Sequence, residues 1–342
     1  MPSTLITLLL TTLALAGCTR VEATPVQGAP AGESDPKAEA MSPEAEKSAA
    51  APTSESSTAP KVVETPQAVV RIQPPGRVVA VGDLHGDLDN AVATLHLAGV
   101  TDAEGRWTGG DTVFVQTGDI TDRGPDSGAL IELLKRLQAE APKTGGQVVA
   151  LLGNHEAMNL TGDWRYVHEG DIAAYGGEAA RKQALGPEGE HGQWLRARPA
   201  AAIVGDTVFV HGGIRAALAT EGLAPINVGV HQSLTGQLQG PAQGIFLGPN
   251  GPLWYRGYVN DPEPTACSEL SEALGSLGVQ RMVVGHTTRR DGHIASRCGG
   301  RLQVIDIGIA DPYGGHLGAW VQDGGDARAV YPDGPTDLED PA

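Results

Sequence analysis

The sequence predicts an α/β fold, and three observations support this prediction. Five short runs rich in β-forming residues lie between residues 77 and 284, and helical patterns separate them. Each run leads directly into a glycine-containing motif that carries Asp, Asn or His. Strands that alternate with helices are typical of α/β proteins. The expected strands are residues 77–81, 112–116, 147–152, 207–210 and 281–284.

The intervening segments agree with this alternation. Residues 128–141 carry apolar side chains at helical spacing, which predicts a helix with one buried face. Residues 218–252 are rich in Gly and Gln and show little periodicity, so we expect a lid or an insertion that shapes the substrate site. The other expected elements are helices at 88–98, 179–185 and 268–277 and strands at 201–204 and 302–307.

The N-terminus has features of a bacterial export signal. Residues 5–16 form an apolar run too short to span a bilayer, and the run ends in Leu-Ala-Gly-Cys18, as in lipoprotein processing sites. We therefore expect residues 1–18 to be a signal peptide and Cys18 to be lipidated. Thr19 favours sorting to the outer membrane, so we expect an envelope protein that faces the periplasm and contacts the membrane only through its lipid anchor. A plain secretory signal is the alternative, because the first four residues carry no Lys or Arg.

Composition divides the rest of the chain. Residues 19–68 are rich in Ala, Pro, Ser, Thr and Glu and carry no aromatic residue, so they cannot bury enough apolar surface to become ordered. We expect a disordered tether there, with a pro-segment or simple spacer as the alternative. Residues 69–334 are the expected catalytic domain, and residues 335–342 a flexible tail.

Charge and cysteine content restrict the partners. The 41 acidic residues outnumber the 24 basic ones, and the net charge of −17 argues against a nucleic-acid partner. Cys267 and Cys298 are the thiols that remain after Cys18. An exported compartment permits a disulfide between them, although their spacing alone does not establish the pairing.

The motifs supply ligands for two divalent metal ions. Carboxylates, an amide oxygen and imidazoles suit cations that act as Lewis acids, and a bridging carboxylate can hold two ions together. Manganese is the expected metal, with iron or zinc as alternatives. The expected ligands are Asp83 and His85 for the first ion, Asp119 as the bridge, and Asn154, His211 and His286 for the second.

Other residues of the motifs suit phosphoester hydrolysis. Two metal ions can generate a metal-bridging hydroxide that attacks phosphorus. His155 is expected to donate a proton to the leaving oxygen, while Asp122 orients its ring and raises its pKa. Arg123 and Arg256 are expected to bind the phosphoryl oxygens. We therefore predict a metal-dependent phosphatase that acts on phosphomonoesters, either phosphoproteins or small phosphate esters.

The motif set resembles a known family. Gly-Asp-x-His-Gly, Gly-Asp-x-x-Asp-Arg-Gly and Gly-Asn-His-Glu are similar to the phosphoprotein phosphatase branch of the calcineurin-like metallophosphoesterases. Residues 154–167 and 253–257 are most like the bacterial Shewanella-like protein phosphatases. The resemblance covers residues 77–320 and implies two mixed β-sheets that form a sandwich flanked by α-helices. It also implies the same metal ligands, phosphate-binding arginines and proton donor that are named above.

One departure and two alternatives qualify this resemblance. Residues 305–309 stand where eukaryotic Ser/Thr phosphatases carry a Ser-Ala-Pro-Asn-Tyr-Cys signature, so no regulatory subunit is inferred. A related branch that hydrolyses dinucleoside polyphosphates shares the motif run that ends at Pro125, and this activity is one alternative. A catalytically inactive, metal-bound envelope protein is the other. Glu156 is expected to support the ligands rather than bind metal, and Tyr166 either lines the cleft or packs against it.

Overall fold

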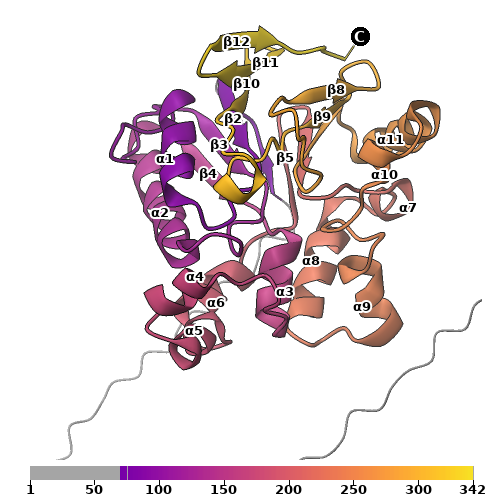
Figure 1. Ribbon diagram of the computed structural model, residues 1–342. Coiled ribbons are helices and arrows are strands. Elements are labelled where there is room, and N and C mark those ends of the chain that lie inside the picture. The colour runs from indigo at the N-terminus through magenta and orange to yellow at the C-terminus, as the bar shows by residue number, and fades with distance from the viewer. Residues whose placement is uncertain (1–69, 75, 342) are drawn as a thin grey trace, which may run out of the picture. The chain divides into compact units, whose positions relative to one another are not determined.

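Two six-stranded β-sheets form the centre of the computed structural model, which describes residues 70–74 and 76–341 (Figure 1). The expected signal peptide and tether, residues 1–18 and 19–68, lie outside the described residues. Each sheet contains both parallel and antiparallel neighbours. The predicted α/β fold with two mixed sheets is confirmed.

The first sheet has the order β12-β11-β10-β2-β3-β4. Strands β2, β3 and β4 are parallel, and β10 pairs with β2 in the antiparallel sense. The bounds are β2 Arg77–Val81, β3 Val113–Gln116, β4 Gln147–Ala150, β10 Ala319–Asp323, β11 Asp326–Tyr331 and β12 Gly334–Asp337.

The second sheet has the order β1-β5-β6-β7-β9-β8. Strands β6, β7 and β9 are parallel, so their carboxyl ends reach the same edge. The bounds are β1 Arg71–Ile72, β5 Ala201–Val204, β6 Thr207–Val210, β7 Arg281–Val284, β8 Ala295–Arg297 and β9 Leu302–Val304.

The alternation of side chains along the strands explains how the layers pack. Phe209 of β6 meets Trp320 of β10 edge to face, with ring centroids 5.6 Å apart, so these two residues join the sheets. The neighbouring Val208 and Val210 belong instead to a core that includes Leu270 of α11. Successive residues of a strand point to opposite faces, and β6 is therefore buried on both sides.

Helices flank the sheets (Figure 1). Helices α1 and α2 lie beside β2, β3 and β4, whereas α11 covers the second sheet. Within the described residues, no helix combines the length and apolar character needed to cross a bilayer. The bounds are α1 Leu88–Leu97, α2 Ser127–Glu140, α3 Asn154–Thr161, α4 Glu169–Ala174, α5 Glu178–Leu185, α6 Glu190–Arg196, α7 Ala216–Ala219, α8 Leu223–Leu234, α9 Gly240–Leu247, α10 Gly257–Asn260 and α11 Glu263–Leu277.

The structure differs from the sequence-based expectation in several segments: α11 begins at Glu263, before the expected residue 268, and β9 ends at Val304, before the expected residue 307. Residues 218–252 contain α8 and α9. In α8, Leu223, Ile226, Val230 and Leu234 are buried at helical spacing, a pattern that the surrounding glycines obscured in the sequence. Residues 335–337, expected in a flexible tail, belong to β12 and pair with β11. Backbone pairing at the sheet edge places them there, although Gly-Pro-Thr-Asp has no strand signature.

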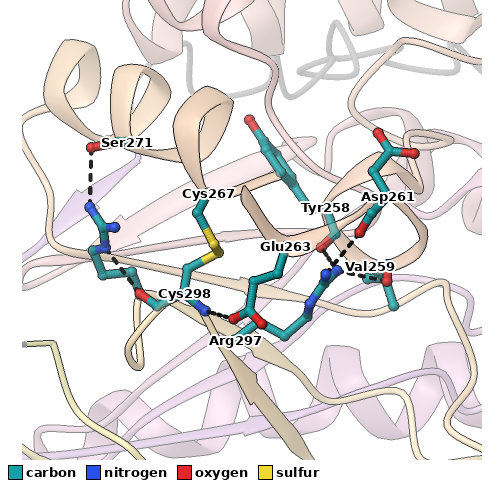
Figure 2. Close-up of a disulfide and its surroundings, with 9 residues drawn as sticks. Tyr258, Val259, Asp261, Glu263, Cys267, Ser271, Arg297 and Cys298 are labelled. Atoms are coloured by element: carbon teal, nitrogen blue, oxygen red, sulfur yellow. Dashed lines mark hydrogen bonds between the residues drawn. A yellow bond between two sulfur atoms is a disulfide. The ribbon is translucent and has the colours of Figure 1, made fainter. Parts of the chain in front are cut away.

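A disulfide joins Cys267 of α11 to Cys298, which follows β8 (Figure 2). Their Cα atoms lie 5.4 Å apart, and the bond closes a loop with a sequence separation of 31. Beside it, the Arg297 guanidinium donates hydrogen bonds to backbone carbonyls of residues 258, 259 and 261 (Figure 2). These contacts tie α10 and the residue after it to β8. The disulfide that the sequence left open is therefore present, and a cross-link over such a loop contributes about 2–4 kcal/mol to stability.

Candidate active site

The five motifs meet where the two sheets end. The turns after β2, β3 and β4 carry the first three motifs, and those after β6 and β7 carry the other two. Because β2, β3 and β4 are parallel, and β6 and β7 are parallel, each set of turns is delivered to one edge of its sheet. Backbone hydrogen bonds then join the turns, for example from His85 N to Asp119 O at 2.9 Å.

The backbone at these turns has uncommon conformations. Among the described residues, six that are not glycine have positive φ, and only Cys298 lies outside the motifs. Such conformations persist where the surrounding structure enforces them, and they cluster at functional sites. Gly153 packs closely on one of these residues, since a Cβ at position 153 would lie 2.1 Å from Asp119 Oδ1. The remaining five residues with positive φ are His85, Asp119, Asp122, Arg123 and His286.

Asp119 lies between two groups of possible ligands. Its Oδ2 is 3.7 Å from His85 Nε2 and 3.2 Å from His211 Nε2. His85 Nε2 is also 3.8 Å from Asp83 Oδ2, and His211 Nε2 is 3.0 Å from Asn154 Oδ1. Ligand atoms of Asp119, His211 and His286 all lie within 4.8 Å of one another. The structure therefore brings the six predicted ligands together, and Asp119 lies between the two groups.

The histidines are arranged as metal ligands usually are. His85 Nδ1 donates to Thr121 O at 3.2 Å, His211 Nδ1 to Thr117 O at 3.0 Å, and His286 Nε2 to Trp254 O at 3.2 Å. A carbonyl oxygen only accepts, so the bonded nitrogen carries a proton, and in the neutral ring the other nitrogen keeps a lone pair for a metal. Burial also lowers the pKa of His85 to about 4 and the pKa of His286 well below its usual value. Neutral imidazoles are the form that binds metal.

The carboxylates add buried negative charge to the same site. Burial, followed by the charges of Asp306 and Asp119, raises the pKa of Asp83 well above its usual value. Burial alone would also raise the pKa of Asp119, but the imidazoles of His211 and His155 lower it well below its usual value. Two neighbouring buried carboxylates are stabilised by bound cations. The residues present therefore fit two divalent metal ions.

Glu156 holds the turns together. Its carboxylate accepts hydrogen bonds of 2.8–2.9 Å from the backbone N–H groups of Asp119, Ile120, Thr121 and Gly153. Burial and the charge of Asp119 raise the pKa of Glu156, although the N–H groups of Thr121 and Gly153 lower it. Glu156 thus supports the bridging residue without entering the ligand set.

Replacing Glu156 by glutamine should weaken metal binding by about 10–100-fold, the range found for partners of metal ligands. The amide retains one acceptor oxygen but turns an NH₂ group toward the backbone N–H donors of the β3 turn. Calorimetric titration with Mn²⁺ measures the effect. Glu132→Gln, at an exposed position of α2, is the control. An unchanged affinity in Glu156→Gln would contradict the supporting role.

The predicted proton-donor pair is also formed. His155 Nδ1 lies 2.7 Å from Asp122 Oδ2, and Asn159 Nδ2 donates to the other carboxylate oxygen at 2.8 Å. Burial alone would lower the pKa of His155, but the charge of Asp119 and the hydrogen bond to Asp122 outweigh burial and raise it. A charged imidazole beside the ligand cluster can protonate a leaving oxygen.

The two predicted phosphate-binding arginines lie at different parts of the site. The Arg123 guanidinium stacks 3.9 Å from the Tyr166 ring centroid, and its buried Nε has no hydrogen-bond partner among the described residues. Arg256 is exposed and donates from NH1 to His286 O at 2.6 Å. Both therefore retain donors for a phosphoryl group. Tyr166 lies beside the proton-donor pair, with its ring centroid 5.2 Å from that of His155.

Two site residues were not singled out from the sequence. Tyr313 stacks on His85 with ring centroids 4.9 Å apart, and no local pattern indicates this contact. Asp306 is buried and contributes to the raised pKa of Asp83. Asp306 follows β9, which is parallel to β7. The five motifs were recognised because each follows a strand-like run, and the same criterion could have identified Asp306.

A groove adjoins Arg256. Its volume is about 700 Å³, and Leu247, Pro249 and Trp254 contribute apolar surface while Asp261 contributes a carboxylate. Leu247 and Pro249 come from the segment 218–252, which was expected to shape the substrate site. The structure places the end of this segment beside a predicted phosphate-binding residue.

Comparisons with known proteins agree with the geometry. Residues 76–290 match the family described as calcineurin-like phosphoesterase. The chain is 38% identical to an uncharacterized protein of Schizosaccharomyces pombe, over 72% of this chain and 76% of that protein. It is 32% identical to Shewanella-like protein phosphatase 2 of Arabidopsis thaliana, over 70% of this chain and 73% of the relative. The crystal structure of a cold-active protein-tyrosine phosphatase from a psychrophilic Shewanella species aligns with a TM-score of 0.71 and 26% identity, covering 81% of this chain and 84% of that one.

Proposed function

This chain belongs to the calcineurin-like phosphoesterase family and is a metal-dependent phosphatase, and we propose that it uses manganese to dephosphorylate proteins in the bacterial cell envelope. The main support for metal-dependent catalysis is the position of Asp119 between the two groups of possible ligands. The family match and the motif order agree with this geometry.

Each side chain has a role that follows from its position. Divalent ions held by the six ligands named above would polarise water and the phosphoryl oxygens at neutral pH. Arg123 and Arg256 would orient the phosphoryl group and offset its charge. His155 would donate its proton to the leaving oxygen, and Asp122 would hold the ring in place through its 2.7 Å hydrogen bond.

Protein substrates are favoured by two observations. Relatives that cover most of this chain are named protein phosphatases. The groove beside Arg256 is apolar at Leu247 and Trp254 and acidic at Asp261, so it can accept the residues that flank a phosphorylated side chain. Small phosphate esters need no such surface.

Metal removal and replacement test this proposal. Full-length enzyme treated with a chelator should lose phosphate release from p-nitrophenyl phosphate and regain it with Mn²⁺ more fully than with Fe²⁺ or Zn²⁺. A phosphopeptide should be a better substrate than diadenosine tetraphosphate. Preferential cleavage of the dinucleotide would favour the alternative activity, and absence of phosphate release with every metal and ester would favour the inactive, metal-bound protein.

The proposed location rests on residues outside the described part of the chain. The apolar run that ends at Cys18 and the polar stretch after it support a lipid anchor and a tether. Cys18→Ser should move the protein from the membrane fraction of expressing cells to the soluble fraction, as measured by fractionation and immunoblotting. An unchanged membrane fraction would contradict the lipid anchor.

A further inference from the structure

Arg181 is a buried cation with no role in the site described so far. It lies on α5, its side chain is fully shielded from solvent, and its guanidinium lies 4.9 Å from the Trp164 ring centroid. Helix α5 lies with α4 and α6 in a helical segment outside both sheets (Figure 1). Burying a guanidinium is costly unless carboxylates compensate its charge.

Two carboxylates compensate Arg181, and one of them belongs to the proton-donor pair. Nε donates to Asp171 Oδ2 of α4 at 2.7 Å, and NH2 lies 3.8 Å from Asp122 Oδ1. Asp122 is itself fully buried. The Arg181 cation therefore forms an ion pair, without a hydrogen bond, with the Asp122 oxygen that accepts from Asn159. His155 is bonded to the other oxygen of Asp122.

A second connection links the same residues through the start of α2. Asp171 Oδ1 accepts a hydrogen bond from Ser127 N at 3.1 Å, and Ser127 Oγ accepts one from Asp122 N at 3.2 Å. Asp122 has a φ of 71°, an uncommon conformation that its surroundings must maintain. The helical segment thus lies 3.8 Å from the carboxylate of Asp122 and is linked to the Asp122 backbone through Ser127.

We infer that Arg181, supported by Asp171, is a positioning residue that holds the Asp122 carboxylate so that His155 points its proton at the leaving oxygen. This inference rests on the proposed phosphatase function. It assigns a catalytic contribution to α4 and α5, which carry none of the motifs. Proton donation matters most when the leaving oxygen is strongly basic. Loss of Arg181 should therefore reduce the rate more for esters with a basic leaving group than for esters with a weakly basic one.

The dependence of rate on the leaving group tests the inference. Arg181→Met should reduce kcat for phenyl phosphate about 10-fold more than kcat for p-nitrophenyl phosphate, with KM changed by less than about two-fold. Asp171→Asn should change the ratio of the two kcat values, which we call the leaving-group ratio, in the same direction. Arg181→Lys should give an intermediate ratio, because a single ammonium keeps the charge but cannot reproduce the guanidinium fork.

Arg281→Met is the matched control. Arg281 is also buried, pairs with Asp340 and lies 5.6 Å from the Trp320 ring centroid, but it stands at the start of β7, away from the end that carries His286. The substitution Arg281→Met should lower the denaturation midpoint without changing the leaving-group ratio.

The outcomes separate the inference from the function on which it rests. An active enzyme whose Arg181 and Asp171 variants lose the same factor with both esters, or lose nothing, would overturn the positioning role. If Arg181→Met does not fold, the leaving-group ratios of Arg181→Lys and Asp171→Asn test the positioning role instead. If the unmodified enzyme releases no phosphate from either ester, the phosphatase function fails and this inference with it.

Discussion

Asp119→Asn is expected to reduce phosphatase activity by at least about 100-fold, the upper end of the loss seen when even a partner of a metal ligand is replaced. Asn tolerates the positive φ of 55° at this position, so the backbone should not be strained. Asp119 Oδ1 accepts a hydrogen bond from His155 N at 2.9 Å, and the amide oxygen of Asn should keep that contact. The NH₂ group of the introduced asparagine would then face the imidazoles of His85 and His211. An uncharged NH₂ group cannot replace the carboxylate oxygen that would bridge the two metal ions.

Metal content and thermal stability should be measured together with the rate. We expect Asp119→Asn to bind less than the full complement of Mn²⁺ by elemental analysis while it remains folded. Asp206→Asn, at the exposed turn between β5 and β6, is the control and should behave like the unmodified enzyme. Full activity with full metal content in Asp119→Asn would exclude Asp119 as the bridge.

His155→Ala should lower kcat by about 10²–10⁴-fold, the usual contribution of a general acid. The imidazole is 2.7 Å from Asp122, and its loss removes the proposed proton donor. The backbone N–H of residue 155 remains available to Asp119, so the metal ligands should keep their positions. Bound Mn²⁺ should therefore be unchanged, unlike in Asp119→Asn.

The contrast between the two variants separates metal binding from proton transfer. Steady-state rates for p-nitrophenyl phosphate and phenyl phosphate should show a larger loss for the more basic leaving group in His155→Ala. His96→Ala, at an exposed position of α1, should leave both rates unchanged. Equal losses for both esters, or loss of the metal, would show that His155 acts in some other way.

Much of the candidate site could be predicted because its chemistry is encoded locally. Asp83, Asp119 and His286 each follow a short β-type run within a glycine-containing turn, and one strand is enough to show that pattern. The parallel pairing of the strands then brings the turns together. Arg181 and Tyr313 could not be recognised in this way. Their importance comes from contacts with Asp122 and His85, which lie far away in the sequence.

The sequence by itself determined the α/β alternation, the set of candidate ligands and the family, since each depends on residue types within a few positions of one another. Tertiary structure decided the Cys267–Cys298 pairing, the strands at the sheet edges and the place of Arg181 behind Asp122. Strand β10, for example, pairs Trp320 with Ala80. A hydrophobic pattern indicates which face of a strand is buried and so restricts its register. It does not identify which distant segment becomes the neighbouring strand.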